Sequence, residues 1–119
     1  MSTLRKPTET QRFTIKQEAM CVLDAEEIGD QTGGLKRRVT LLVPVPDAQA
    51  EPPIGAVFMA IDIPTPDDIA LTRTYHMVPV VGGFPIRFYL QPEQKLYLMV
   101  ASAMAVVGAI IEYLEDPKS

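Results

Sequence analysis

Few side chains in this sequence have the chemistry of a catalyst. His76 is the single histidine and Cys21 the single cysteine among 119 residues. Nucleophilic catalysis needs a base held against a nucleophile, and a reactive thiolate needs an electropositive setting. His76 stands in a predicted strand, and Cys21, between Met20 and Val22, is typical of a small buried hydrophobic residue. The residue types therefore predict no catalytic site, and we expect a protein that is not an enzyme.

Ligands for a metal or a phosphate group are also scarce. One histidine and one cysteine exclude the usual zinc patterns. The acidic segment 24–30 (DAEEIGD) lacks the alternating Asp residues and the distal Glu of an EF-hand, which favours a solvated loop. The pairs Gly33-Gly34 and Gly82-Gly83 precede no Lys-Thr and have no G-x-G-x-x-G spacing. We expect no metal, cofactor or small-molecule substrate.

Two short basic segments are the candidates for binding a protein partner. The run 36–38 (KRR) could contact an acidic partner surface or simply solvate the start of a strand. Residues 1–11 are polar and predict a flexible N-terminal arm, which could order on a neighbouring subunit or remain a frayed terminus. The residues predicted to bind a partner are Leu4, Arg5, Lys6, Pro7, Arg12, Lys36, Arg37 and Arg38.

Composition and length indicate one globular domain. The chain is 47% hydrophobic and 22% charged, which is ordinary for a folded protein and wrong for a disordered one. The formal net charge of -4 argues against direct nucleic-acid binding, which usually needs a basic excess. A single cysteine allows no intrachain disulfide, and the N-terminus has no apolar signal sequence. We expect one domain over residues 12–115, followed by a polar tail at 116–119.

Hydrophobic side chains recur at every second position through most of the chain, which is the period of a strand. In residues 35–45, for example, Val39, Leu41, Val43 and Val45 share one side. Eleven prolines and several glycines separate the runs. The pattern predicts an all-β fold, an antiparallel β-sandwich or jelly roll of seven to eight short strands with a flexible arm. The predicted strands lie at 12–16, 20–23, 35–45, 54–63, 69–78, 86–91, 96–100 and 106–114.

Residues 93–115 allow two interpretations. The segment is free of proline, and its alanines and methionines would suit one buried helix. It is also rich in valine, isoleucine and tyrosine, which favours a β-hairpin of two strands. Residues 96–111 carry no charge, but this run is shorter than the roughly 20 residues that a membrane-spanning helix needs. We favour two strands and no membrane span.

A family resemblance lies in the C-terminal third. Residues 81–90 (VGGFPIRFYL), 91–97 (QPEQKLY) and 105–113 (AVVGAIIEY) resemble the final hairpin of small β-sandwich virion proteins of tailed bacteriophages, notably capsid cement (decoration) proteins. In those hairpins a short Pro-x-Gln turn and a strand ending in Val-x-Val/Ile-x-Glu recur. Their tips often carry Ser-Gly or Gly-Thr, whereas this chain has Ser102-Ala103-Met104.

The resemblance implies a jelly-roll virion structural protein. Such a protein would bind the lattice of the major capsid protein on the outer surface of the capsid, after synthesis in the host cytoplasm. It would join neighbouring capsomers and stabilise the shell, as a homo-dimer or homo-trimer. No catalytic residues come with the resemblance. Many copies, each burying a modest apolar area, would act together.

Two other classes of protein remain open. The alternative is a receptor- or carbohydrate-binding β-sandwich module of a phage tail fibre, which predicts an exposed aromatic patch from Tyr75, Tyr89 and Tyr97. The last is a small enzyme or a membrane-associated subunit.

Overall fold

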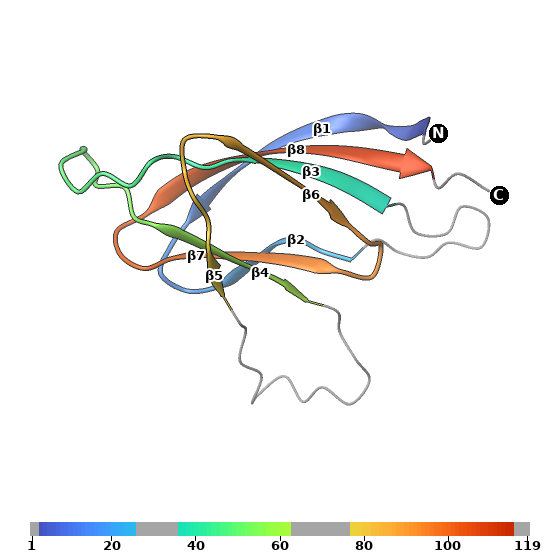
Figure 1. Ribbon diagram of the computed structural model, residues 1–119. Coiled ribbons are helices and arrows are strands. Elements are labelled where there is room, and N and C mark those ends of the chain that lie inside the picture. The colour runs from blue at the N-terminus through green and yellow to red at the C-terminus, as the bar shows by residue number, and fades with distance from the viewer. Residues whose placement is uncertain (1–2, 26–35, 63–76, 116–119) are drawn as a thin grey trace, which may run out of the picture.

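The part of the chain that the structure describes is built from β-strands (Figure 1). The structure is a computed structural model and describes residues 3–25, 36–62 and 77–115. Within these ranges no helix is long and apolar enough to cross a bilayer. The strands are β1 (Thr3–Ile15), β2 (Met20–Leu23), β3 (Lys36–Leu42), β4 (Val57–Asp62), β5 (Val78–Pro79), β6 (Pro85–Leu90), β7 (Lys95–Val100) and β8 (Ala105–Glu115).

The strands form two antiparallel four-stranded sheets. The first sheet has the order β1-β8-β3-β6 and the second has the order β2-β7-β4-β5. Consecutive strands lie in opposite sheets at every connection except that between β4 and β5. This is the arrangement of an eight-stranded jelly roll, so the predicted all-β sandwich is confirmed. In Figure 1 the two sheets are the upper and lower layers of the molecule.

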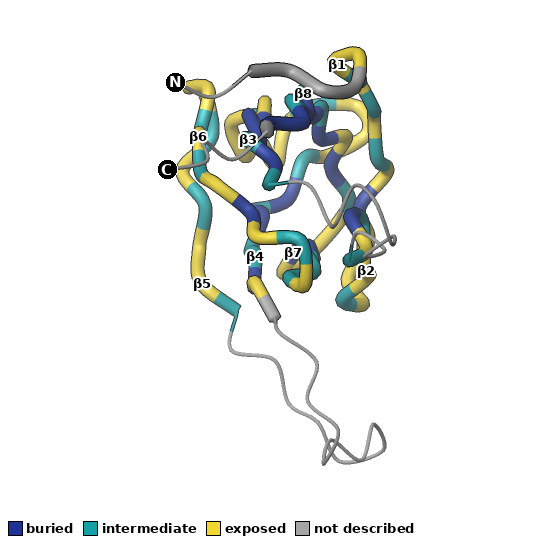
Figure 2. Tube along the Cα trace, turned by 90° about the vertical axis from the view of Figure 1, so that its right-hand side faces the viewer, coloured by how far each residue is buried: buried dark blue, intermediate teal, exposed yellow. Residues whose placement is uncertain are grey.

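The core fills the space between the two sheets, and alternation along each strand supplies it. On β8 every second residue from Val107 to Tyr113 is buried, and on β7 the same is true from Leu96 to Val100. Val39 and Leu41 face them from β3 and are fully buried. Figure 2 shows the buried residues concentrated where the two layers face each other. The outward positions of the same strands are therefore the ones available for binding.

Residues 93–115 form two strands, β7 and β8, as favoured, but the two strands are not a hairpin. β7 pairs with β2 and β4, whereas β8 pairs with β1 and β3. The connection between them passes from one sheet to the other, with Ala103 in a left-handed conformation at φ 58°. Strand propensity predicted the strands, but pairing partners are decided by contacts that are distant in sequence.

The flexible arm predicted for residues 1–11 is wrong for the residues that the structure describes. From Thr3 onward they belong to β1, which pairs with β8 down to the Thr3–Glu115 register position. β8 is long, and without β1 its outer edge would expose a row of unpaired backbone groups. Threonine at positions 8 and 10 suits this strand. The single domain thus includes most of the predicted arm.

Two predicted strands differ in detail, and others fall outside the described residues. The strand predicted at 35–45 ends at Leu42, and Val45, expected to face the core, is 59% exposed. Ile61, which shares the parity of Val57 in the strand predicted at 54–63, is 40% exposed near the end of β4. Most of the strand predicted at 69–78, most of the acidic segment 24–30 and the tail 116–119 lie outside the described ranges.

Candidate functional site

The structure brings together no catalytic or metal-binding group among the residues it describes. His76 lies outside the described residues. Cys21 is exposed rather than buried, and its Sγ lies 3.5 Å from the backbone oxygen of Leu23. In the described ranges no three His, Cys, Asp or Glu side chains are placed to hold a metal ion. The exposed residues predicted to bind a partner are the next candidates for a functional site.

The basic run 36–38 is divided between the two sides of β3. Arg37 points into the core and is only 2% exposed, so its prediction as a partner-binding residue is wrong. Its Nη1 donates to the backbone oxygen of Asp24 at 2.7 Å, and its Nη2 donates to those of Gln91 and Gln94 at 3.3 and 3.0 Å. Arg37 is two residues before the buried Val39, and residues two apart on a strand face the same side. The sequence pattern therefore predicts that Arg37 faces the core. This side chain ties β3 to the turn between β6 and β7.

Lys36 and Arg38 lie on the outward side of β3. Nε and Nη2 of Arg38 donate to the two carboxylate oxygens of Glu112 on β8, each at 2.7 Å. These hydrogen bonds lower the pKa of the Glu112 carboxyl and raise the pKa of the Arg38 guanidinium. The Nζ atom of Lys36 lies 4.8 Å from the centre of the Tyr89 ring on β6. Lys36, Arg38 and Tyr89 therefore share one surface.

The remaining predicted residues lie on β1, with one strand between it and β3. Pro7 and Arg12 are exposed, while the side chains of Leu4, Arg5 and Lys6 lie outside the described set. Arg12 pairs with Gly108, which is level with Leu42 at the far end of β3 from Lys36. The strand β8 separates β1 from β3. The predicted set is not a single surface.

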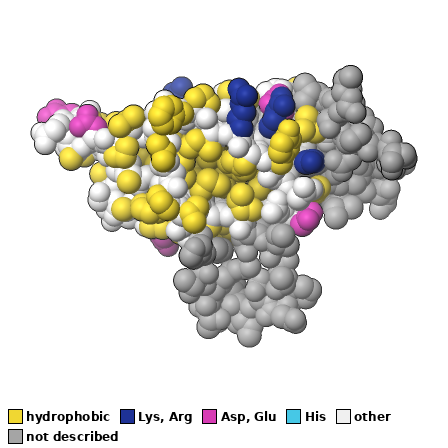
Figure 3. Space-filling view, in the orientation of Figure 1, with side chains coloured by type: hydrophobic (Ala, Val, Ile, Leu, Met, Phe, Trp, Pro, Cys, Tyr) yellow, Lys and Arg dark blue, Asp and Glu magenta, His cyan; other side chains and the backbone are white. Residues whose placement is uncertain are grey.

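Sequence reasoning missed an apolar patch at the Leu42 end of the first sheet. We define the apolar patch as Leu42, Val45, Val81, Phe84 and Val106. Val81 is 68% exposed and Phe84 is 64% exposed, the highest values among the large hydrophobic residues that the structure describes. Figure 3 views the molecule from the side of β5 and β6 and shows hydrophobic side chains over much of that side. Large exposed apolar patches in soluble proteins often mark interaction sites.

Close backbone packing holds the apolar patch in place. The loop before β6 lies on the segment after β3, and the N–H of Gly83 donates to the backbone oxygen of Val43 at 2.8 Å. A Cβ added to Gly82 would lie 2.1 Å from the backbone oxygen of Pro44. Gly83 has a φ of +95°, which glycine adopts without strain. The glycine pair therefore allows the two segments to touch.

Hollows extend from the apolar patch across this end of the sandwich. Leu42, Phe84 and Val106 line a hollow of about 320 Å³ together with Pro44 and Pro85. A second hollow of about 260 Å³ adjoins it. Its lining shares Pro44 and Val106 with the first hollow and adds Glu51, Pro52, Pro53, Ile54, Met104 and Ala105.

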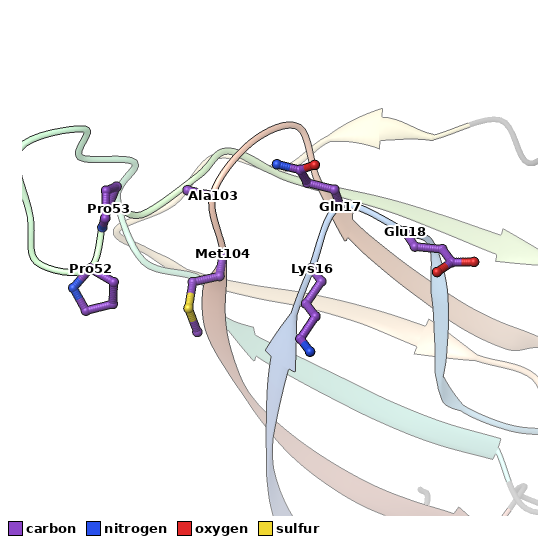
Figure 4. A pocket seen from close by; sticks show the side chains of 7 residues that line it. All are labelled: Lys16, Gln17, Glu18, Pro52, Pro53, Ala103 and Met104. Carbon is purple, nitrogen blue, oxygen red and sulfur yellow. The ribbon is translucent and has the colours of Figure 1, made fainter.

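The row of hollows ends beside residues 16–18, which follow β1. Met104 lies between the prolines 52 and 53 on one side and Lys16 on the other, while Glu18 points away from it (Figure 4). The lining is mainly proline and aliphatic, with no histidine or cysteine. Lys16, Glu18 and Glu51 are the charged residues of this lining, and its largely apolar remainder suits an apolar protein segment.

The tyrosines that were expected to form an aromatic patch do not lie together. Tyr89 is exposed on the outward side of the first sheet. Tyr97 belongs to β7 in the second sheet, between the inward-facing Leu96 and Leu98, and so points out of the opposite layer. Tyr75 lies outside the described residues. The part of the chain that is described therefore gives no support to a carbohydrate site of this kind.

Comparisons with known proteins bear on the fold. No protein-family model and no curated protein matches the sequence. Among solved structures, the chain is similar to one from the work "Bacillus endospore appendages form a novel family of disulfide-linked pili". The TM-score is 0.53 at 13% sequence identity, over 98% of this chain and 92% of the other. At that identity the likeness shows a shared β fold.

Proposed function

We propose that this chain is a structural subunit of a virus particle, a capsid cement protein that binds the major capsid protein through the apolar patch. The observation that carries the proposal is the exposure of Phe84 beside Leu42 and Val106, with the exposed Val81 in the same loop before β6, which is packed closely on the segment after β3. Burying these side chains against another protein would remove apolar area from water, which is the main driving force of association. The proposal gives the chain no catalytic role.

The binding of many copies to one capsid would make this small surface sufficient to stabilise the shell. A single copy has a small patch, and an interface of that size is weak by itself. Many copies on a lattice act together, and each could contact two neighbouring capsomers. The preformed geometry of the patch, set by the Gly82–Pro44 approach, lowers the entropy lost on binding. In this proposal the protein lies on the outer surface of the capsid.

The test is attachment to particles from the native source. We expect the chain to co-sediment with a large regular particle, in a fixed ratio to its main shell protein by mass spectrometry. Replacing Val81→Ser and Phe84→Ser together should abolish attachment of the purified chain to particles that lack it. Met20→Ser is the matched control, because Met20 is an exposed apolar residue on β2 at the opposite edge. Equal attachment of all these proteins would exclude the apolar patch as the docking surface.

A filament subunit is the second candidate. It is favoured by the fold shared with a chain from disulfide-linked pili of Bacillus endospores. A jelly roll that binds its own copies would serve such a role as well as a capsid lattice does. Negative-stain electron microscopy of the chain from its native source separates the two, because filaments support this candidate and icosahedral particles support the first.

A further inference from the structure

Three cations gather around Tyr89 on the outward side of the first sheet. Arg38 pairs with Tyr89 on one side and Glu112 on the other, and Arg87 lies two residues before Tyr89 on β6, opposite Thr40. Lys36 covers the Tyr89 ring. We call Lys36, Arg38, Arg87, Tyr89 and Glu112 the cationic patch. Its three cations and one carboxylate leave a net charge of +2, in a chain whose net charge is -4.

An acidic loop lies at the other end of the molecule. The 47–53 loop carries Asp47 and Glu51, and no Lys or Arg occurs between Val43 and Val57. All of its residues except Ala50 are exposed. Figure 1 shows the connection between β3 and β4 projecting beyond the sheets, and Figure 3 shows acidic side chains at that projection.

Backbone hydrogen bonds give the 47–53 loop a defined shape. Asp47 and Ile54 exchange two backbone hydrogen bonds of 2.9 Å, which close its base. The Asp47 carboxylate accepts the N–H of Gln49 at 2.9 Å. At the base, the N–H of Gly55 donates to the backbone oxygen of Met104 at 2.9 Å. A loop with a preset shape loses less entropy when a partner binds it.

The two charged regions cannot meet within one copy. The cationic patch extends along β3 from Lys36 to the level of Thr40, which pairs with Arg87, and the 47–53 loop begins five residues after the end of β3 at Leu42. The six residue steps from Lys36 to Leu42 span about 20 Å, whereas Arg87 is level with Thr40, two steps from Leu42. The 47–53 loop also projects away from the sheet and is tied at its base. Attraction between the two regions is available only between different copies.

We propose that the 47–53 loop of one copy docks on the cationic patch of the next, so that copies associate head to tail. Glu51 and Asp47 face Lys36 and Arg87, while the prolines 52 and 53 pack on the exposed Tyr89 ring. Because different surfaces of the two copies meet, the contact is heterologous and closes as a ring or extends as a filament. The Arg38–Glu112 ion pair remains intact and orients the patch.

The expected contact is weak and depends on salt. Exposed ion pairs contribute little one by one, but tyrosine and arginine are the residue types that most often dominate interfaces. Raising the ionic strength from about 0.01 M to about 1 M shortens the screening length from about 30 Å to about 3 Å. We expect the association constant to fall at least about tenfold over that range. Capsid binding by the apolar patch uses none of the residues of this contact, although Glu51, Pro52 and Pro53 line the hollow that adjoins the patch.

The test is sedimentation velocity of the purified full chain over a wide range of concentration at low and high salt. The loop variant is Asp47→Asn/Glu51→Lys, in which the amide oxygen can still accept the Gln49 N–H. The face variant is Lys36→Glu/Arg87→Glu, which spares Arg38 and Glu112. The control is Glu18→Gln/Glu93→Lys, which changes the net charge as much as the loop variant does, at two other exposed positions.

Each of the first two variants should sediment as a monomer, and the control should associate like the unchanged chain. An equimolar mixture of loop and face variants should associate again, because the intact loop of one meets the intact patch of the other. Circular dichroism verifies folding, and Glu51→Lys alone replaces the loop variant if that variant unfolds. A chain that is monomeric at low salt, or a mixture that stays monomeric, would overturn the proposal. The serine variants of the apolar patch should still self-associate, so failure here is distinguishable from failure of capsid binding.

Discussion

The two ends of the first sheet differ in what their side chains contact, although the same strands form both. At the Lys36 end, Arg37 is satisfied inside by three backbone oxygens and Arg38 is satisfied outside by Glu112. At the other end, Phe84 and Val81 stand in solvent. Internal contacts at the first end contribute to stability. Exposed apolar area at the second contributes little to the stability of the free chain, and in our proposal it is buried by a partner.

The largest loss of stability is expected from replacing Arg37, whose guanidinium is buried. Replacing Arg37→Met removes the three hydrogen bonds that join β3 to Asp24 and to the turn between β6 and β7. We expect a loss of about 2 to 4 kcal/mol in the free energy of unfolding. Urea denaturation measures it. Arg38→Met is the comparison on the same strand and should cost much less, because that side chain is partly exposed. Equal losses would contradict the division between the inner and outer sides of β3.

The next effect concerns the backbone under the apolar patch. In Gly82→Ala the new methyl group would lie 2.1 Å from the backbone oxygen of Pro44, which has no side-chain freedom to move away. We expect a loss of about 2 kcal/mol and a weaker apolar patch. The matched control is Gly108→Ala, where the nearest atom lies at an ordinary 3.6 Å on Leu42. Thermal unfolding should show a lower Tm for the first variant alone.

A smaller effect is expected from the ion pair at the Lys36 end. The hydrogen bonds from Arg38 hold the pKa of Glu112 below its ordinary value of 4.5, so this carboxylate stabilises the fold above that pH. The contribution disappears as the pH falls through the lowered pKa. Glu112→Gln should therefore lower the Tm slightly at neutral pH and not in strong acid. Asp24 also has a lowered pKa, first because its carboxylate accepts a hydrogen bond from the Ala25 N–H. Asp24 is present in the unchanged chain and in the Glu112→Gln variant, so it does not affect the difference in Tm between them.

The smallest change in stability is expected from the apolar patch itself. Val81→Ser and Phe84→Ser alter side chains that are mostly in water, so the free energy of unfolding should change by less than about 0.5 kcal/mol each. Val107→Ser, at a fully buried position of β8, provides the contrast and should be strongly destabilising. Marked destabilisation by the patch variants would mean that these residues support the fold rather than a contact.

Alternation in the sequence was enough to predict the sandwich. The buried positions of β7 and β8 are those that a period of two assigns to the core. The same rule placed Lys36 and Arg38 outside, and it also places Arg37 inside, against its prediction as a binding residue. Short-range patterns predict which way a residue faces because adjacent side chains on a strand point to opposite sides.

Pairing and the site depend on contacts that no local pattern contains. The polar composition of residues 3–11 predicts an arm, yet the open edge of β8 recruits them into β1. The separation of β7 and β8 into two sheets follows from strands far along the chain. The apolar patch joins residues from three distant segments, and each of them is an ordinary hydrophobic residue in the sequence. The prolines next to Val45 and Phe84 indicate turns in these segments, and they are the one feature of the sequence that points to the apolar patch.

The most direct test of the central claim is hydroxyl-radical footprinting of the chain, free and within its native assembly. Phe84 is exposed in the free chain and should be oxidised readily there. In the assembly we expect its oxidation to fall severalfold, while Met20 at the opposite edge keeps its reactivity. Equal oxidation of Phe84 in the two states would show that the apolar patch contacts nothing, and the proposed role in docking would be wrong.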